Sequence, residues 1–434
     1  MDTSMIGIIG IVIMIVLMFV GMPIGFAMAL TGLMGLMYLQ NWNFAFSTAG
    51  IIPFSAVFDF NKLTVPLFLL MSAVAYRSGM AEGGYKVANA ILGRIRGGLA
   101  IATTMGCGAF AAICGSSVAT SAAIGQVALP EMKKYGYDTK LAIGSITAGG
   151  TVGIMIPPSI GFIIYSILTG ESVGRLFMAG FLPGILQVIF YIGTISILCW
   201  RNPKLGPPGP KTDLKTTLKA TGESWPMIFL FVLVLGGIYL GVFTAMEAGA
   251  LGAFFAAVIG IISRKMSGRN FVEALLETGR TTGMIFMLIV GAYLFNNFLT
   301  LTNLGEDMGK LVTSFGVNRY VILFAILILY IILGCIMDVA AALFLTVPII
   351  YPIILALNFD PIWYGVLMVR ILEIGELTPP IGLNCFVMAS MTNTPLYTVF
   401  RAVTPFIITD FFHLALLAAI PEISLWLPGM MVNK

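Results

Sequence analysis

The sequence predicts an all-α polytopic membrane protein that is built from two related halves. Of its 434 residues, 59% are hydrophobic and only 10% are charged, and the mean hydropathy is +1.01. Soluble domains carry about a quarter charged residues, so this composition excludes that class. Apolar segments recur along the chain, and roughly 20 apolar residues are enough for one helix to span the hydrocarbon. We therefore expect the spans to be helices.

The second observation is an internal repeat. Several landmarks of the first half recur 222 residues later in the second half. They are Pro130 and Pro352, Asp138 and Asp360, Gly153 and Gly375, Pro157 and Pro379, Pro158 and Pro380, and Pro183 and Pro405. Two hydrophobic halves that are broken by Gly and Pro at corresponding places are typical of secondary transporters, which bind solutes at the breaks.

We expect a first repeat at residues 1–200, a linker at 201–222 and a second repeat at 223–434. The linker is rich in Pro, Gly and Lys, its stretch 207–210 cannot be helical, and its basic excess places it in the cytoplasm. Apolar segments of the first repeat lie at 5–20, 22–39, 50–75, 97–133, 140–167 and 176–200. Those of the second repeat lie at 225–243, 246–263, 282–300, 319–357, 361–392 and 396–428.

The segments at about 97–133 and 319–357 are interrupted near their middles and predict re-entrant helical hairpins. Basic residues, among them Arg96 and Lys133, flank the first hairpin on both sides, so both of its ends are expected in the cytoplasm. The number of spans between the basic linker and the second hairpin puts that hairpin on the opposite side. The repeats are therefore predicted to be inverted, each with one hairpin and one broken helix.

The hairpin tips carry residues suited to binding. The first tip reads Cys114-Gly115-Ser116-Ser117, where Gly ends one half-helix and Ser caps the next. A half-helix N-terminus favours an anion, and carbonyls at the end of the preceding half-helix favour a cation. Tight packing of small residues is the alternative interpretation.

At the second tip, between Gly334 and Ala341, Asp338 occupies the position that corresponds to Ser116. A charge in the membrane core usually faces a cavity, a cation or a partner. Asp338 could also serve only as a helix cap.

Each hairpin is followed by a broken helix, at about 140–167 and 361–392. The first contains Gly149, Gly150, Thr151, Pro157, Pro158 and Ser159, and the second contains Gly375, Thr378, Pro379 and Pro380. A Pro pair frees carbonyls one turn earlier, and with Thr and Ser hydroxyls these oxygens suit a hard cation such as Na⁺. A kink satisfied by neighbouring helices is the alternative.

Arg370, Glu373 and Glu376 lie on or near the second broken helix. Arg370 and Glu373 are three residues apart and can pair along one helix face. Two interpretations stay open, a buried neutral pair or an Arg370 that also attracts a carboxylate substrate.

Motifs for other function classes are absent from the sequence. The stretch 305–310 is too short for a phosphate-binding loop and is followed by Leu311 where Ser or Thr is required. A lone His413 cannot form a metalloprotease pair, and there is no Gly-x-Ser-x-Gly elbow. Neither an ATP-driven motor nor an enzyme is expected.

Together, the two hairpins, the motifs at 150–159 and 373–384 and the stretch 244–250 resemble the large membrane subunit of tripartite ATP-independent periplasmic (TRAP) transporters. The resemblance covers essentially the whole chain and is closest to the sialic-acid type. It implies an elevator-type, Na⁺-driven importer of a small organic acid in the bacterial inner membrane. Sialic acid is favoured, with C4-dicarboxylates and 2-oxo acids as possibilities. Its partners would be a small four-helix membrane subunit and a periplasmic substrate-binding protein.

The resemblance also implies which residues bind. Na⁺ would be held in the first half by Ser116, Ser117, Gly149, Gly150, Thr151 and Pro157, and in the second half by Gly334, Asp338, Gly375, Thr378 and Pro379. Substrate would lie near Ser116, Ser117, Ser159 and Asp338, with Arg370 as a further candidate. Arg370 and Glu376 stand where many members of the family have uncharged residues. A passive channel, which would need neither ion coupling nor a binding protein, is the alternative function.

Overall fold

The computed structural model describes residues 3–209, 213–314 and 316–431, and within them every regular element is helical. The first half contains α1 (Thr3–Phe19), α2 (Ile24–Leu39), α3 (Trp42–Val57), the 3₁₀ turn η1 (Phe60–Leu63), α4 (Thr64–Arg77), α5 (Ala81–Leu92), α6 (Gly98–Cys114), α7 (Ser117–Lys134), α8 (Thr139–Met155), α9 (Ile160–Thr169) and α10 (Val173–Arg201). The second half contains α11 (Leu214–Glu223), α12 (Trp225–Phe231), the π-helical turn η2 (Val232–Gly236), α13 (Gly237–Tyr239), α14 (Ala245–Ile262), α15 (Gly268–Thr302), α16 (Leu304–Ser314), α17 (Arg319–Ile336), α18 (Val339–Ala356), α19 (Pro361–Leu377), α20 (Leu383–Thr392), α21 (Leu396–Ala419) and α22 (Glu422–Gly429).

Seven of the described helices are long and apolar enough to cross a membrane, or nine if two bent pairs each count as one span. This confirms the predicted all-α membrane protein. The segment expected as one span at 50–75 is bent by 54° between α3 and α4. Helix α3 ends at Val57, and Asp59 then caps η1 by accepting a hydrogen bond from the Asn61 N–H at 3.0 Å. The first expected span, α1, is a shorter apolar helix of 17 residues.

Two helix pairs, α7 with α18 and α8 with α19, recur at the same 222-residue spacing as the sequence landmarks. Helices α7 and α18 begin at corresponding residues and each have 18 residues. Helices α8 and α19 likewise correspond, and each has 17 residues. Asp138 and Asp360 cap these last two helices in the same way, each accepting from two backbone N–H groups. Local capping and the Gly and Pro breaks therefore set the same helix bounds in both halves.

The two ends of each hairpin lie together. For the first hairpin, the Leu99 N–H donates to the Tyr137 hydroxyl at 3.0 Å. Residues of the linker join both ends, since the Gly97 N–H donates to the Gly206 carbonyl at 2.9 Å and the Asp138 N–H donates to the Leu205 carbonyl at 2.9 Å. For the second hairpin, Arg319 donates to the carbonyl of Asn358 at 3.4 Å. Each hairpin thus returns to the side from which it starts.

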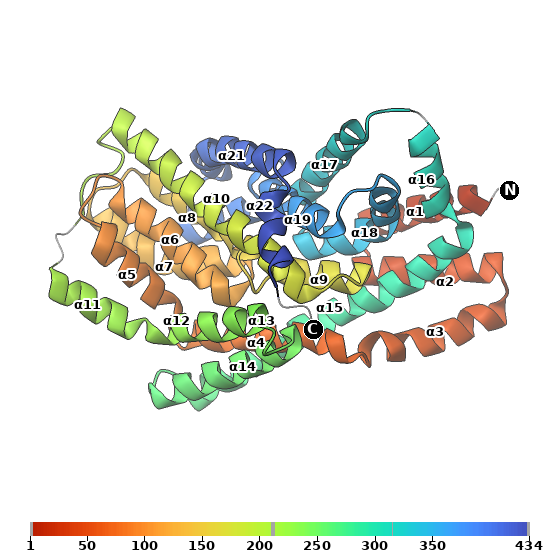
Figure 1. Cartoon of the computed structure of the whole chain (residues 1–434), viewed down its shortest axis with the longest axis horizontal. Coiled ribbons are helices and arrows are strands. Elements are labelled where there is room, and N and C mark those ends of the chain that lie inside the picture. The colour runs from red at the N-terminus through yellow and green to blue at the C-terminus, as the bar shows by residue number, and fades with distance from the viewer. Residues whose placement is uncertain (1–2, 210–212, 315, 432–434) are drawn as a thin grey trace.

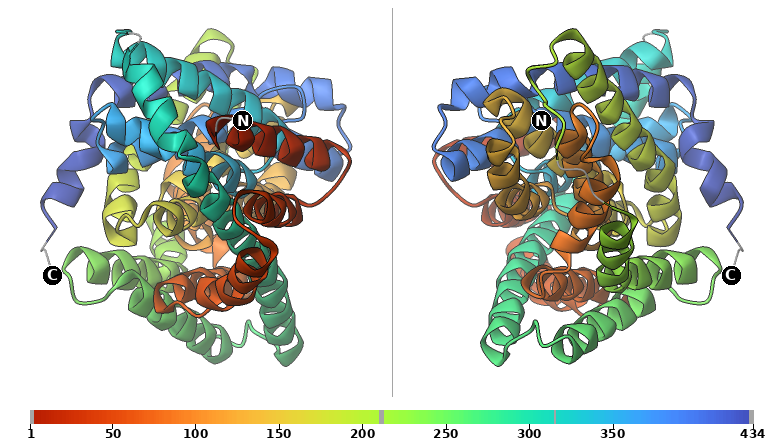
Figure 2. Two further views of the ribbon diagram at one scale, coloured as in Figure 1. Left: turned by 90° about the vertical axis from the view of Figure 1, so that its right-hand side faces the viewer. Right: turned by 90° about the vertical axis from the view of Figure 1, so that its left-hand side faces the viewer.

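Part of the linker is helical, which the sequence did not predict. Residues 207–209 are non-helical as expected, residue 210 lies outside the described residues, and α11 occupies the end of the linker from Leu214 onward. Figure 1 shows α5 to α8 at one end of the molecule and α16 to α18 at the other, with α3, α4 and α14 along the lower edge. The views in Figure 2 again place these helices in the lower part of the molecule, where α3 packs against α2 and α15, and α4 packs against α6 and α15.

Helices α8 and α19, the first parts of the two broken helices, form the centre of the protein. All residues of α8 from Leu141 to Met155 are buried, and so are all residues of α19 from Ile362 to Leu377. Helices α8 and α19 contact each other, and each is also packed against α10 and α21. The core therefore places the first broken helix beside the second.

We expect residues near Arg96 and Lys133 to face the cytoplasm, and residues near Arg319 and Asp360 to face the periplasm. The linker contacts at the first hairpin and the basic-residue rule motivate this expectation. Single Cys residues at these positions in a Cys-free background are treated with a membrane-impermeant thiol reagent from outside intact cells. Labelling only at the second pair is expected, and labelling of both pairs from the same side would contradict the inverted arrangement.

Candidate functional site

In each half the hairpin tip lies against the break of the following helix. In the first half Gly115 is in close contact with the Pro158 carbonyl, and a Cβ at Gly153 would lie 3.0 Å from the Ser116 carbonyl oxygen. In the second half the Gly382 N–H donates to the Cys335 carbonyl at 3.3 Å. In each half, the break at the hairpin tip and the break in the following helix therefore lie side by side.

Glycine makes this approach possible in the second half. A Cβ at Gly375 would lie 2.6 Å from the backbone of Gly334, and a Cβ at Gly334 would lie 2.8 Å from the Leu372 carbonyl oxygen. Real Cβ atoms do not approach so closely, so α17 and α19 meet backbone to backbone. The structure therefore brings together two residues predicted to share one Na⁺ site.

Three predicted site residues are helix caps. Ser116 caps α7 by accepting from the Ala119 N–H at 3.4 Å, and Ser159 caps α9 by accepting from the Phe162 N–H at 3.4 Å. Asp338 caps α18 by accepting from the Ala340 N–H at 3.2 Å, and it is exposed whereas Ser159 is completely buried. The capping interpretation and the binding interpretation are compatible, because a capped N-terminus still presents further N–H groups.

Ser117 connects the two halves. Its hydroxyl donates to Glu376 Oε2 at 2.6 Å, and the Asn384 side-chain amide donates to the same oxygen at 3.4 Å. Ser117 and Glu376 are each 2% exposed. The tip of the first hairpin is therefore hydrogen-bonded to the second broken helix through a buried carboxylate.

Oxygen atoms without a hydrogen-bond partner gather around the first tip. Among the described residues, the buried side-chain oxygens Thr120 Oγ1 and Ser121 Oγ have no partner. A Cβ at Gly153 would lie 2.9 Å from Thr120 Oγ1, and Ser121 Oγ is in close contact with Gly150. Thr120 and Ser121 belong to the tip segment but were not among the predicted site residues, although their spacing of three and four residues from Ser117 places all three on one face of α7. Hydroxyl and carbonyl oxygens of this kind suit a hard cation.

The hydroxyl of Thr151 points away from the tip. It donates to the Ala148 carbonyl at 2.8 Å and lies 3.2 Å from the Tyr191 hydroxyl and 3.2 Å from the Gln187 amide nitrogen. In the second half the Thr378 hydroxyl donates to the Ile374 carbonyl at 2.7 Å. Gly149 packs against Cys107, Pro157 is buried in the first break, and Pro379 is exposed in the second.

Arg370 lies in a buried polar network rather than at the tips. Its guanidinium donates to Glu373 at 2.9 Å and to His413 Nδ1 at 3.0 Å, and it forms an ion pair with Asp410. Asp410 in turn accepts from the Tyr191 hydroxyl at 2.9 Å. Arg370, Glu373, Asp410 and His413 are all completely buried. The network joins α8, α10, α19 and α21.

Sequence reasoning missed Tyr191, Gln187 and Asp410. Asp410 offered a signal, because it is the only acidic residue in the apolar helix α21. A charge inside such a segment is expected to have a partner. Its partner Arg370 is 40 residues away, and local sequence patterns do not specify a contact at that separation.

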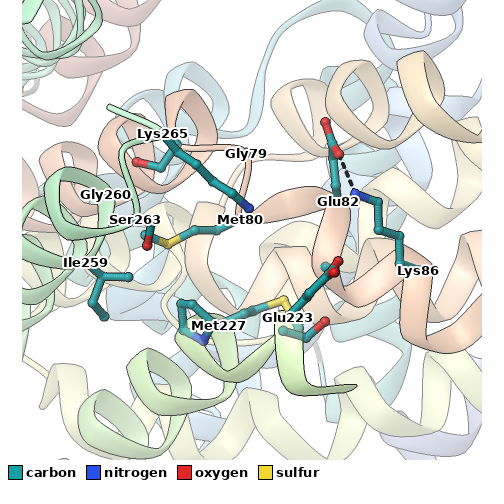
Figure 3. A pocket seen from close by; sticks show the side chains of 14 residues that line it. Gly79, Met80, Glu82, Lys86, Glu223, Met227, Ile259, Gly260, Ser263 and Lys265 are labelled. Carbon is teal, nitrogen blue, oxygen red and sulfur yellow. Dashed lines mark hydrogen bonds and ion pairs between the residues drawn. The ribbon is translucent and has the colours of Figure 1, made fainter. Parts of the chain in front are cut away.

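A small surface cavity lies away from the tips. About 30 Å³ of space, enough for one or two water molecules, is enclosed by α5, the start of α12 and the end of α14. Figure 3 shows Met80 and Met227 beside this space, with the ion pair between Glu82 and Lys86 at its edge. None of the predicted site residues lines it.

A protein-family model described as "Tripartite ATP-independent periplasmic transporter, DctM component" matches residues 11–423. The chain belongs to this family. It is 38% identical to a C4-dicarboxylate TRAP transporter large permease of Pseudomonas aeruginosa over 85% of this chain and 86% of that protein. It is 28% identical to a sialic acid TRAP transporter large permease of Vibrio cholerae over 96% of this chain and 97% of that protein. These relatives are transporter permeases and not enzymes.

The fold is also similar to that of a solved transporter, YdaH of Alcanivorax borkumensis. The TM-score is 0.57 at 14% sequence identity, and the match covers 88% of each chain. This likeness concerns the fold alone. The large TRAP permease described here is a multi-pass membrane protein, and the inner membrane is the usual location of such permeases.

Proposed function

We propose that this TRAP large permease imports a small organic acid across the bacterial inner membrane, driven by Na⁺ and by an elevator-type motion. The acid would be delivered by a periplasmic substrate-binding protein, and a small four-helix membrane subunit would complete the transporter. The observation that carries the proposal is the hydrogen bond between Ser117 and Glu376. It joins the tip of one half to the break of the other, which is where repeat-built transporters bind solute and ions.

The proposed Na⁺ sites follow the two contacts between tip and break. In the first half the ligands are drawn from Ser116, Ser117, Gly149, Gly150, Thr151 and Pro157, and in the second from Gly334, Asp338, Gly375, Thr378 and Pro379. The close approach of Gly334 and Gly375 and the unpartnered oxygens near Gly150 and Gly153 support these assignments. At Thr151 the hydroxyl is already engaged, so the backbone carbonyl is the proposed ligand.

The substrate would lie between the tips, near Ser116, Ser117, Ser159 and Asp338. Sialic acid is our first candidate, and the name of the Vibrio cholerae relative supports it. A C4-dicarboxylate is supported by the name of the Pseudomonas aeruginosa relative, and a 2-oxo acid is a further possibility. Arg370 would act on the substrate only through α19, because its guanidinium is occupied by Glu373, Asp410 and His413.

Asp338→Asn and Thr378→Ala are expected to raise the Na⁺ concentration needed for half-maximal uptake by roughly three- to tenfold, because each removes an oxygen ligand or its charge. Uptake is measured in proteoliposomes that contain both membrane subunits, with the binding protein added. Thr346→Ala is the matched control, since its buried hydroxyl also donates to the carbonyl four residues earlier, at 2.6 Å, but lies away from the tip. An unchanged Na⁺ requirement in both test variants would show that Asp338 and Thr378 have structural roles and do not bind Na⁺.

A further inference from the structure

The two halves of the candidate site differ in charge. In the first half, helices α7 and α9 are capped by the neutral hydroxyls of Ser116 and Ser159. In the second half, α18 is capped by the carboxylate of Asp338, and the carboxylate of Glu376 follows directly after the Gly375 contact with the second tip. The first half therefore offers partly positive helix ends to an anion, whereas the second half offers hydrogen-bond acceptors and negative charge.

Glu376 and Asn384 form the acceptor side. Both are buried, and the Asn384 amide donates to Glu376 Oε2 at 3.4 Å. Among the described residues, the Asn384 side-chain oxygen has no hydrogen-bond partner. A buried acceptor without a partner costs free energy, so a bound molecule that brings a donor to it is stabilised.

No basic side chain near the two hairpin tips and helix breaks is available to neutralise a second negative charge on a ligand. Residues 97–132, 141–174, 320–369 and 371–400 contain no Lys, Arg or His. Arg370 lies between the last two of these ranges, and its guanidinium bonds to Glu373, Asp410 and His413. The helix ends and bound cations are therefore the sources of attraction for an anion.

We propose, resting on the transport function above, that Glu376 determines specificity by selecting organic acids with one carboxylate and several hydroxyl or amide donors over dicarboxylates. The single carboxylate meets the N-terminus of α9, because the start of α7 is already bonded to Glu376 through the Ser117 hydroxyl, and the donors meet Glu376 and Asn384. A dicarboxylate puts its second charge beside Glu376 and Asp338, where like charges disfavour binding.

The test is direct binding to the purified complex of this chain with its small membrane subunit, which avoids the selectivity of the binding protein. The probes are gluconate and N-acetylneuraminate, which have one carboxylate and several donors, and succinate, which has two carboxylates. In Na⁺ buffer the wild-type complex should bind the better monocarboxylate at least about tenfold more tightly than succinate. Glu376→Gln should lower this ratio about tenfold, because the negative charge is removed while the shape is kept.

Glu373→Gln is the matched control, because this second buried glutamate of α19 bonds to Arg370 and not to the tips. Its preference for the monocarboxylate should equal that of the wild type. Two results with the wild-type complex alone would overturn the assignment. Succinate could bind as tightly as both monocarboxylates, or both monocarboxylates could fail to bind. An unchanged ratio in assembled Glu376→Gln also overturns it. If the ligands bind equally tightly in choline and in Na⁺ buffer and the preference for the monocarboxylate is kept, only the proposed Na⁺ coupling is contradicted, and the specificity assignment stands.

Discussion

Asp410→Ala should destabilise the protein by about 3–5 kcal/mol, because it leaves the completely buried guanidinium of Arg370 without its Asp410 partner. The same change removes the acceptor of the Tyr191 hydroxyl. The measurement is thermal unfolding of the purified membrane complex, followed by the loss of monodisperse protein. Asp410→Asn, which keeps an acceptor for Tyr191, should be less damaging than Asp410→Ala.

Glu277→Ala is the matched control for this prediction. Glu277 pairs with Arg77 at 2.9 Å, but its side chain is 52% exposed. Exposed ion pairs contribute at most about 1 kcal/mol, since water solvates both charges when the pair is broken. Equal shifts of the unfolding midpoint in Asp410→Ala and Glu277→Ala would show that the buried network does not hold the core together.

The network matters for transport because of the elements that it joins. Thr151 belongs to the first broken helix and Arg370 to the second, and Gln187, Tyr191 and Asp410 connect them through α10 and α21. Both broken helices are buried against each other. We expect them to move as one body in transport, because displacing one relative to the other would leave several buried polar groups unpaired.

The parts of the fold that the sequence predicted are those that depend on local signals. The bounds of α7, α8, α18 and α19 follow from Gly and Pro breaks and from capping by Ser116, Asp138, Asp338 and Asp360. Such signals act within a few residues, so they can be read along one segment. The same reasoning missed the bend near Asp59, where Asp59, Asn61 and Lys62 interrupt a hydrophobic stretch.

The contacts between the halves could not be predicted from sequence. Ser117 and Glu376 are 259 residues apart, and Tyr191 and Asp410 are 219 residues apart. Such pairs depend on how whole helices pack, and a hydrophobic pattern gives only the buried face of each helix. Arg370 illustrates the limit, because its distance of three residues from Glu373 predicted one pair but gave no sign of Asp410 or His413.

Accumulation of the organic acid is expected only when a Na⁺ gradient and both partner proteins are present. The sequence contains no ATP-binding loop, whereas two hairpin tips with hydroxyl and carboxylate oxygens face two helix breaks. One Na⁺ moving inward across 100 mV releases about 2.3 kcal/mol, so two ions would drive substantial accumulation of an anion without ATP. Uptake by proteoliposomes is measured with the small membrane subunit, the binding protein or the Na⁺ gradient omitted in turn, and each omission should reduce accumulation to the level of empty liposomes.

The same experiment separates an importer from a passive channel. A channel equilibrates its solute without ion coupling, so it would give flux through this chain alone that saturates weakly and persists after the Na⁺ gradient is collapsed. An importer that receives its substrate from a binding protein saturates with that protein and stops without the gradient. Accumulation by this chain alone, or undiminished accumulation after collapse of the Na⁺ gradient, would falsify the coupled tripartite mechanism, because Na⁺ entry would then supply none of the free energy for solute movement.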